Sequence, residues 1–442
     1  MTDFQLLGVT LSVLLLSTVV LHLLWRRRRL PVMLLGYSCH LPDSDRRCTL
    51  DLCEYLGLRM NIYDLQAREF MHLIYSKSGL GEETYMPPYL MQPVERLSVK
   101  HPPAIQEAEE GIFTTVSTLL CKTDVAPQDI SLVVVACSLF SPSPSLSALL
   151  IKQFGFNESV KTYTFSGMGC SAGTMCVDFA ARLLRHQPGY ALIVVTESTG
   201  VNWYFGNNRH MLVTNCIFRV GSAALILTSD QTQRPKAKME LVLTQRTHLG
   251  ADDSAYGAAI QMDDEDGMVG VALTKDLIRV AGTSLRRHIS TLAPHVLPLS
   301  EMVRYAYRVG KSYLSRDKKA ASVQVPDFTK AFEHICFHAG GKAVIDSVGK
   351  LMKFDPGVLE PARMTLHRFG NTSSSLVFYE LAYFEAKGRI KKGDRIWMLA
   401  FGTGFKACSV VWRALKDSSM DPDNPWVNCI HRYPVSVASN RS

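Results

Sequence analysis

Residues 162–186 read TYTFSGMGCSAGTMCVDFAARLLRH, and this stretch decides the class of fold. Its first four residues predict a short strand, and the segment from Cys176 to His186 continues a helix. Between them, residues 166–173 contain three glycines and other small residues, which let the backbone turn tightly. A strand that leads through a tight glycine turn into a helix is typical of α/β proteins.

The alternation of strands and helices extends in both directions from this stretch. Short apolar runs rich in β-branched residues predict buried strands at 130–137, 190–196, 223–228, 239–244, 334–338, 395–401 and 407–413. Amphipathic patterns predict helices at 104–120, 146–154, 276–291, 301–313, 343–350 and 373–387. This order predicts a largely parallel sheet covered by helices on both faces. Residues 31 to about 95 read as irregular because prolines interrupt them, apart from a helical pattern at 65–75.

Composition excludes several classes of protein. The chain has 442 residues, of which 47% are hydrophobic and 20% are charged, so an intrinsically disordered chain is excluded. The formal net charge is +8, and the four consecutive arginines at 26–29 supply half of it. Eleven cysteines are scattered through the chain, which is not the pattern of a small secreted disulfide scaffold and favours a reducing compartment.

The segment before the arginines predicts a membrane anchor. Residues 6–25 carry no formal charge apart from the titratable His22, and a helix of about 20 residues spans the hydrocarbon core of a bilayer. A signal peptide would need cations before the apolar run, whereas here Asp3 precedes it and the arginines follow. The positive-inside rule then places the arginines and the bulk of the chain in the cytosol. Beside such an anchor, lipid headgroups are the expected partners of the arginines, in place of nucleic acid.

Cys170 is the candidate nucleophile. It lies in the glycine turn at the predicted start of a helix, where the dipole and free N–H groups lower the pKa of a thiol. A thiolate is a strong nucleophile. The same position equally suits a small buried residue in a strand–helix turn.

Three further positions beside glycines are candidates for the rest of the site, because a nucleophile needs a base and an oxyanion stabiliser. His338 stands at the end of a predicted strand, in HAGG, and is otherwise a hydrogen-bonded structural histidine. Asn371, in GNTSS, lies just before a predicted helix and is otherwise its N-cap. The loop 402–406, GTGFK, offers backbone N–H groups or is merely a tight turn.

Other kinds of site are not favoured. His334, Cys336 and His338 alternate along one strand, but a zinc site needs a fourth ligand and no CxxC pair exists. The sequence has no phosphate-binding loop of the Walker type, and the glycines at 167, 169 and 173 are one residue too widely spaced for the dinucleotide fingerprint. No metal and no cofactor are expected.

Taken together, the motifs resemble those of the 3-ketoacyl-CoA synthases, the membrane-bound condensing enzymes of very-long-chain fatty acid elongation. Beside the cysteine turn, the motifs are SGLGEETYMPP at 78–88, CSLFSPSPSLS at 137–147, NWYFGN at 202–207, RTHLGADD at 246–253, HAGG at 338–341, GNTSS at 370–374, GTGFK at 402–406 and RYP at 432–434. The sequence departs from the commoner pattern in having one N-terminal span in place of two, and at residues 196–200.

The resemblance implies a thiolase-type fold of two similar α/β halves, usually dimeric, with acyl-CoA and malonyl-CoA as substrates. It implies that Cys170 accepts the acyl group and that His338 and Asn371 bind the malonyl thioester carbonyl. It assigns supporting roles to His248, His334 and His367, and the loop of Gly402, Gly404 and Phe405 is expected to supply oxyanion donors. Other elongase enzymes are expected as partners, at the endoplasmic reticulum membrane.

The organisation expected from these observations has four parts. They are an anchor with its arginine cluster at 1–30, a linker or cap at 31–95, an N-terminal half with the cysteine at 96–240, and a C-terminal half with the histidine and asparagine at 241–442.

Three rival functions remain. A degradative thiolase is expected to carry a second cysteine in the 402–406 loop, which has none. The second rival is a polyketide synthase of the chalcone-synthase type, which shares the Cys–His–Asn set. The third is a membrane scaffold that has the same fold but no catalytic activity.

Overall fold

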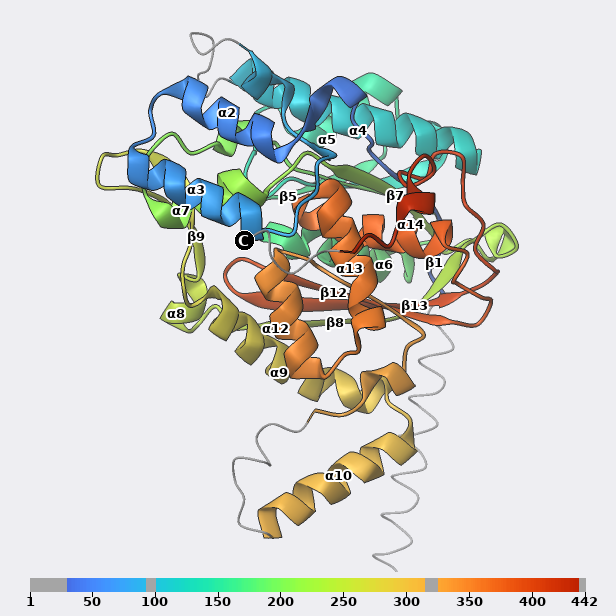
Figure 1. Cartoon of the computed structure of the whole chain (residues 1–442). Helices are drawn as coiled ribbons and strands as arrows, with labels where there is room; N and C mark the ends of the chain where they lie inside the picture. The colour runs from blue at the N-terminus through green and yellow to red at the C-terminus, as the bar shows by residue number, and fades with distance from the viewer. Residues whose placement is uncertain (1–29, 93–100, 315–324, 437–442) are drawn as a thin grey trace, which may run out of the picture.

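A nine-stranded sheet forms the centre of the molecule (Figure 1). The computed structural model describes residues 30–92, 101–314 and 325–436. The strands lie in the order β11-β12-β13-β8-β1-β7-β6-β4-β5. Their bounds are β1 Met33–Cys39, β4 Ile130–Ala136, β5 Lys161–Phe165, β6 Tyr190–Thr196, β7 Ser222–Thr228, β8 Met239–His248, β11 His334–Phe337, β12 Arg395–Gly402 and β13 Lys406–Ala414.

The two ends of the sheet repeat one pattern of strand directions. From one end, β4 runs parallel to β6, β6 antiparallel to β7, and β7 antiparallel to β1. From the other end, β11 runs parallel to β12, β12 antiparallel to β13, and β13 antiparallel to β8. The two runs meet where β1 pairs with β8 through Met33 and Leu34. The sheet is therefore built from two similar four-stranded units, and β5 is an addition to the first.

The prediction of a largely parallel sheet is wrong, because antiparallel pairs predominate. Only β4 with β5, β4 with β6 and β11 with β12 are parallel among the described strands. The turn between β12 and β13 is only three residues long, and a connection that short can join only antiparallel strands. Residues 33–39 were predicted to be irregular, but they form the fully buried strand β1.

Helices cover both sides of each unit and fill the space between the units (Figure 1). The longer helices are α2 Leu50–Met60, α3 Leu65–Lys77, α4 His101–Thr123, α5 Leu146–Phe154, α6 Ala172–Leu184, α7 Arg209–Ile217, α9 Leu277–Val296, α10 Leu299–Leu314, α12 Lys342–Met352, α13 Pro356–Phe369 and α14 Leu376–Ala386. A short helix, α8 Asp253–Tyr256, and two small antiparallel sheets complete the fold. One sheet pairs β2 Arg47–Cys48 with β3 Thr84–Tyr85 across α2 and α3, and the other is the hairpin of β9 Ala259–Asp263 and β10 Val269–Leu273. The predicted helices and strands are all present; α2, α7 and α13 were not predicted.

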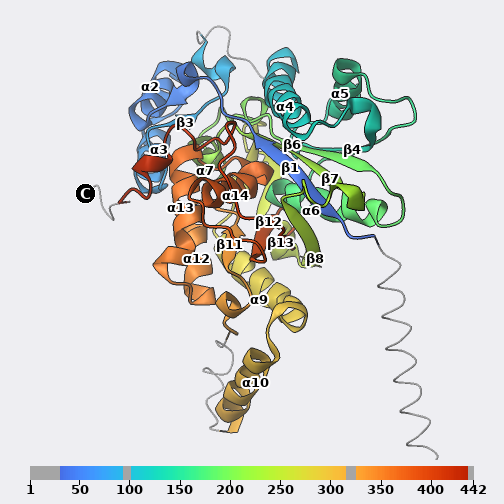
Figure 2. The same cartoon turned by 90° about the vertical axis from the view of Figure 1, so that its right-hand side faces the viewer.

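Alternate residues of the strands divide the interior into layers. On β4, Val134 belongs to the core shared with α6 and α14, whereas Val133 and Val135 belong to the core under α4 and α5. On β12, Met398 faces the same central core, and Trp397 faces the core under α9 and α12. The two units of the sheet therefore form two separate layers, and α6 and α14 lie between them. Outer helices cover the other face of each unit, so the order of layers is helix, sheet, helix, sheet and helix (Figure 2). Within the described ranges no helix is long and apolar enough to cross a bilayer; the predicted anchor at 6–25 lies outside those ranges.

Glycine allows the two central helices to approach closely. A Cβ atom on Gly173 of α6 would lie 2.5 Å from the carbonyl oxygen of Ser374 and 3.0 Å from the ring of Phe378. The first of these contacts is with backbone, which cannot rotate away. The 3-10 turns that precede α6 and α14, Gly169–Ser171 and Ser373–Ser375, are thereby held against each other.

We expect Gly173→Ala to lower the free energy of unfolding by about 1–3 kcal/mol, because an added methyl group overpacks the central layer. Urea unfolding of the purified protein measures this change. Gly357→Ala is the matched control, since a Cβ atom there meets nothing within 4 Å. Equal stability of the Gly173→Ala protein and the wild type would show that α6 and α14 can move apart to accommodate the methyl group without loss of stability.

Candidate active site

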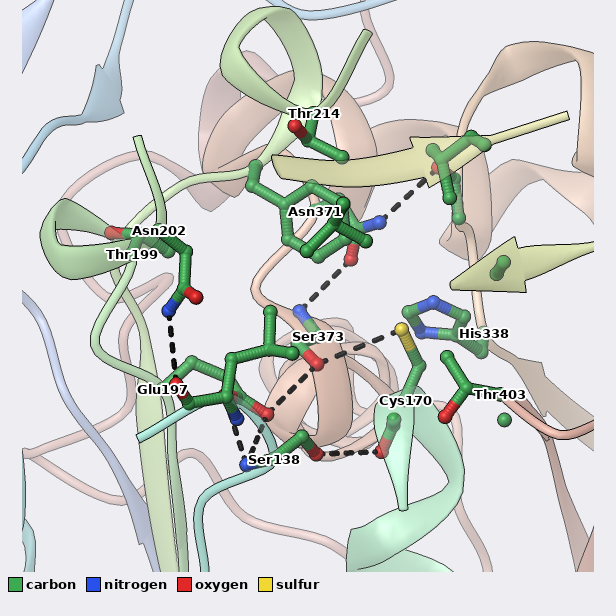
Figure 3. Close-up of a pocket in the computed structure, with 18 of the residues that line it drawn as sticks. Ser138, Cys170, Glu197, Thr199, Asn202, Thr214, His338, Asn371, Ser373 and Thr403 are labelled. Carbon is green, nitrogen blue, oxygen red and sulfur yellow. Dashed lines mark hydrogen bonds between the residues drawn. The ribbon is translucent and has the colours of Figure 1, made fainter. Parts of the chain in front are cut away.

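Cys170, His338 and Asn371 line one cavity of about 150 Å³ between the two units of the sheet (Figure 3). Cys170 comes from the turn before α6, His338 from the residue after β11, and Asn371 from the residues between α13 and α14. The rest of the wall is mainly apolar and includes Trp203, Phe218, Leu273, Phe401 and Phe405. The three candidates are far apart in sequence, and the pairing of the two units brings them together.

The turn that carries Cys170 is pressed against the turn between β12 and β13. Gly169 has φ of +61°, and a Cβ atom there would lie 2.7 Å from the backbone nitrogen of Thr403. A Cβ atom on Gly402 would lie 2.5 Å from the carbonyl oxygen of Met168. The hydroxyl of Thr403 also donates to the Gly167 carbonyl, 3.2 Å away. Glycine at 169 and 402 therefore brings the loop predicted to bind the oxyanion beside the nucleophile.

The environment of Cys170 favours the neutral thiol. Burial raises the pKa of Cys170 to about 12, although the Ser373 hydroxyl, which contacts Sγ at 3.6 Å, and the backbone N–H of Cys170 lower it. The nearby Glu197 carboxylate raises it further. The net direction is opposite to the lowering predicted from the helix N-terminus, and burial is the largest cause. A proton acceptor must therefore take the thiol proton when the sulfur attacks.

His338 is the candidate proton acceptor, because its ring lines the cavity beside the sulfur and is neutral. Burial lowers the pKa of His338 to about 4, so the imidazole is neutral at physiological pH. Neither ring nitrogen has a hydrogen-bond partner among the described residues, although both are buried. The ring and the Cys170 sulfur point toward each other in the cavity (Figure 3). Buried polar atoms without partners are rare in proteins, and here they face the space that a substrate would fill.

Asn371 is held rigidly at the wall of the cavity. Its side-chain Nδ2 donates to the Gly340 carbonyl at 3.2 Å, and its Oδ1 accepts from the Ser373 backbone N–H at 2.9 Å. Its backbone forms a bridge with Phe218 in the other half of the chain. The N-cap interpretation is wrong, because Thr372 precedes the turn Ser373–Ser375 and Ser375 precedes α14, whereas the side chain of Asn371 lines the cavity.

Sequence reasoning missed a hydrogen-bonded network behind the nucleophile. The buried Glu197 carboxylate, at the end of β6, accepts from the backbone N–H of Ser138 at 3.0 Å and of Leu139 at 3.3 Å. It also accepts from the Ser373 hydroxyl at 3.2 Å, and that hydroxyl contacts the Cys170 sulfur (Figure 3). Burial raises the pKa of Glu197, while these hydrogen bonds oppose the rise. Residues 196–200, noted for departing from the commoner pattern, include this carboxylate.

We expect Ser373→Ala to slow acyl transfer to Cys170 by about tenfold or more, because the substitution removes the hydroxyl between the sulfur and Glu197. Single-turnover acylation, followed by mass spectrometry, measures the rate. Ser374→Ala is the matched control: Ser374 is equally buried, and its hydroxyl has no partner among the described residues. Equal rates in the two variants would remove Ser373 from the site.

The remaining predicted site residues divide between the cavity wall and other places. Gly402 and Phe405 line the cavity, as Thr403 does, but Gly404 is not among the lining residues. None of the three supporting histidines reaches it; His248 accepts from the Gly250 backbone N–H, His334 contacts Asp394 at 2.9 Å, and His367 contacts the Tyr433 hydroxyl at 3.1 Å. Their supporting roles stay predictions. The described residues contain no cluster of three or more potential metal ligands.

The depressed pKa of His338 predicts a stability change with pH. The usual pKa of histidine is 6.5 and that of folded His338 is about 4, so the unfolded chain binds more protons between these values. The free energy of unfolding should therefore fall as pH is lowered from 7 to 4, with about 3 kcal/mol of that fall due to His338. His338→Asn should flatten the fall, as measured by urea unfolding at each pH. Parallel curves for wild type and variant would show that His338 titrates normally.

Comparison with known proteins identifies the family. Residues 23–313 match the family model described as FAE1/Type III polyketide synthase-like protein, and residues 329–414 match the 3-oxoacyl-[acyl-carrier-protein] synthase III C-terminal model. The chain is 44% identical over 432 residues to 3-ketoacyl-CoA synthase 11 of Arabidopsis thaliana, covering 97% of this chain and 84% of that protein. It is 43% identical to 3-ketoacyl-CoA synthase 8 of the same plant, and the match covers 97% of this chain and 90% of that protein.

Solved structures with the same fold are more distant in sequence. PKS-I from the brown alga Ectocarpus siliculosus gives a TM-score of 0.67 at 19% identity, covering 87% of this chain and 98% of that one. Tetrahydroxynaphthalene synthase from Streptomyces coelicolor gives a TM-score of 0.66 at 18% identity, and the match covers 87% of this chain and 99% of that one. These likenesses concern the fold alone, and they confirm the thiolase-type α/β architecture. On the strength of the sequence identity over nearly its whole length, the chain belongs to the 3-ketoacyl-CoA synthase family.

Proposed function

We propose that this protein is a 3-ketoacyl-CoA synthase, which condenses a long-chain acyl group with malonyl-CoA in fatty acid elongation. The observation that carries the proposal is the meeting of Cys170, His338 and Asn371 at one mainly apolar cavity. A thiol beside a neutral imidazole suits acyl transfer. The apolar wall suits an acyl chain.

In the first half-reaction, Cys170 accepts the acyl group. The thiol proton passes to the neutral His338 as the sulfur attacks the acyl-CoA carbonyl, and His338 returns it to the departing CoA sulfur, which leaves as the thiol. We assign stabilisation of the oxyanion to backbone N–H groups at Cys170 and in the adjacent 402–405 turn. Loss of one such donor raises the barrier by about 3 kcal/mol in known cases.

In the second half-reaction, malonyl-CoA loses carbon dioxide and attacks the acyl-cysteine. Decarboxylation leaves an enolate whose negative charge develops on the thioester oxygen. His338 has ring nitrogens free of protein partners, and Asn371 is fixed beside it by Gly340 and Ser373. We assign to these two side chains the hydrogen bonds that stabilise the enolate. The enolate carbon then attacks the Cys170 thioester and releases 3-ketoacyl-CoA.

Neither half-reaction is a net oxidation or reduction, so the proposed chemistry needs no redox cofactor. Acyl-CoA and malonyl-CoA are the proposed substrates. Residues 6–25 are proposed to anchor the chain in the endoplasmic reticulum membrane in a single pass, with the condensing fold in the cytosol and other elongase enzymes nearby. A homodimer is proposed from the fold.

The experiment that tests the function is product analysis after expression of the full-length chain in a host with a defined acyl-CoA pool. The expected products are fatty acids two or more carbons longer than those of the host. A polyketide product would support the chalcone-synthase-like alternative. An unchanged profile, with the protein present in membranes, would leave only the non-catalytic scaffold.

A further inference from the structure

Two thiols outside the cavity lie next to each other. Cys48 ends β2 and Cys53 lies in the second turn of α2. Their sulfur atoms are 3.0 Å apart, and both side chains are buried. A disulfide bond is about 2.05 Å long, so the sulfur atoms need approach by only about 1 Å to form one. The mechanism uses neither thiol.

A buried cation faces this pair. The guanidinium of Arg219 is almost fully buried and lies 3.4 Å from the Cys53 sulfur through Nη2. Its other hydrogen bonds go to the hydroxyl of Thr84 and the carbonyl of Phe218, both uncharged. Within the described part of the chain no carboxylate forms an ion pair with it. A Cys53 thiolate is therefore the anion best placed to balance this charge.

The same surroundings make the two thiols unequal. The hydrogen-bonded contact with Cys48 and the positive charge of Arg219, 3.4 Å from the sulfur, lower the pKa of Cys53 against the effect of burial. The hydrogen bond to Cys53 raises the pKa of Cys48. The pair thus resembles an attacking thiolate with a neighbouring resolving thiol, which is the arrangement of oxidation-sensitive cysteines.

Arg219 also connects the pair to the active site. Its backbone N–H donates to the Asn371 carbonyl at 3.0 Å, and the Asn371 N–H donates to the carbonyl of Ile217 at 3.0 Å. Gly370 packs so closely on Arg219 that a Cβ atom there would lie 2.3 Å from Cγ of the arginine. A movement of Arg219 must therefore displace the segment that holds Asn371.

We propose that Cys48 and Cys53 form a reversible disulfide when the protein meets a hydroperoxide, and that Arg219 transmits this oxidation to Asn371. The Cys53 thiolate attacks the peroxide oxygen, which yields a sulfenic acid and, for hydrogen peroxide, hydroxide. The Cys48 sulfur then attacks the sulfenic sulfur, its proton leaves with the hydroxyl as water, and the disulfide forms. Two thiols are oxidised and one peroxide is reduced to two waters.

A small oxidant can reach the pair because α2 lies on the outside of the molecule (Figure 1). On this helix Tyr55 is 56% exposed and Leu58 is 54% exposed, so its outer face contacts solvent. Local opening of a peripheral helix costs less free energy than global unfolding. Disulfide formation removes the thiolate that balances Arg219, and the guanidinium must find a new position.

The test is direct because trypsin leaves both cysteines in one peptide, residues 48–59. Full-length protein is treated with hydrogen peroxide, alkylated with iodoacetamide and digested. The expected peptide is two hydrogens lighter and carries no alkyl group, and dithiothreitol restores double alkylation. Cys176, a buried thiol of α6 whose pKa burial alone raises, should remain reduced in the same sample. Double alkylation of peptide 48–59 after peroxide would overturn the proposal.

Two variants test the order of events. In Cys48→Ser the resolving thiol is absent, so Cys53 should stop at sulfenic acid and react with dimedone. In Cys53→Ser, Cys48 should not react. Equal labelling in the two variants would remove Arg219 from the activation of Cys53.

The link to Asn371, which rests on the proposed function, has a separate readout. Malonyl-CoA decarboxylation by the oxidised wild type should fall by about tenfold to a hundredfold and recover with dithiothreitol. Cys53→Ser should keep its rate through the same treatment. A disulfide that forms without this loss would overturn the link alone. A protein inactive in both redox states would contradict the proposed function, while the peptide masses would still decide the disulfide.

Discussion

We expect Cys170→Ala to lower condensation of acyl-CoA with malonyl-CoA by at least about a thousandfold, because the substitution removes the atom that holds the acyl group. The effect should be on chemistry and not on folding. Cys170 occupies a turn whose shape is set by Gly167 and Gly169, and alanine removes only the sulfur. The measurement is the rate of 3-ketoacyl-CoA formation by the variant in membranes that contain the same amount of protein.

The same variant should still decarboxylate malonyl-CoA, since His338 and Asn371 remain in place. Cys176→Ala provides the matched control. It removes a buried thiol six residues along the chain, which lies in the central core and not in the cavity, and it should keep condensation. Undiminished condensation by Cys170→Ala would assign the nucleophile to another residue.

We expect His338→Ala to lower malonyl-CoA decarboxylation by about a hundredfold to a thousandfold, which is the loss found when one donor to a developing oxyanion is removed. His338 is the only one of the candidate histidines that lines the cavity, and no described residue forms a hydrogen bond with its ring nitrogens. Release of carbon dioxide from labelled malonyl-CoA measures the reaction. Condensation should fall at least as far, because it needs both the enolate and the proton acceptor.

His338→Gln separates the donor from the base. Glutamine keeps an N–H donor but cannot accept the thiol proton as imidazole does, so decarboxylation should be lost less than in His338→Ala. Acylation of Cys170 should fall in both variants. Decarboxylation that survives in His338→Ala at the wild-type rate would leave Asn371 and the backbone as the sole donors.

The fold was predictable where local pattern and tertiary role agree. Apolar β-branched runs such as Tyr190–Thr196 became buried strands at the predicted residues. β1 was missed because its sequence, MLLGYSC, lies among prolines and includes a glycine and a serine. Gly36 is there for packing: a Cβ atom would lie 2.8 Å from Thr123 of α4. The direction of each strand could not be predicted from its local sequence. At the centre of this sheet, parallel and antiparallel strands are both buried on two faces, so both have the same apolar pattern.

The site was predictable in part for a similar reason. Cys170, His338 and Asn371 stand beside glycines at the ends of elements, and such positions carry function more often than element interiors do. Ser373 and Glu197 were not singled out, because their role depends on contacts between segments 176 residues apart. A buried glutamate at the end of an apolar strand was the available signal. Nothing in the sequence around the three supporting histidines indicated that they do not line the cavity.

The central claim is that the acyl group passes through a thioester on Cys170. The most direct measurement is the mass of the purified full-length enzyme after incubation with a long-chain acyl-CoA in the absence of malonyl-CoA, followed by digestion. We predict that one acyl chain is added, that it lies in the tryptic peptide 162–182, and that malonyl-CoA removes it with release of 3-ketoacyl-CoA. Turnover to 3-ketoacyl-CoA with no adduct on Cys170, or with the acyl chain on another residue, would contradict this account.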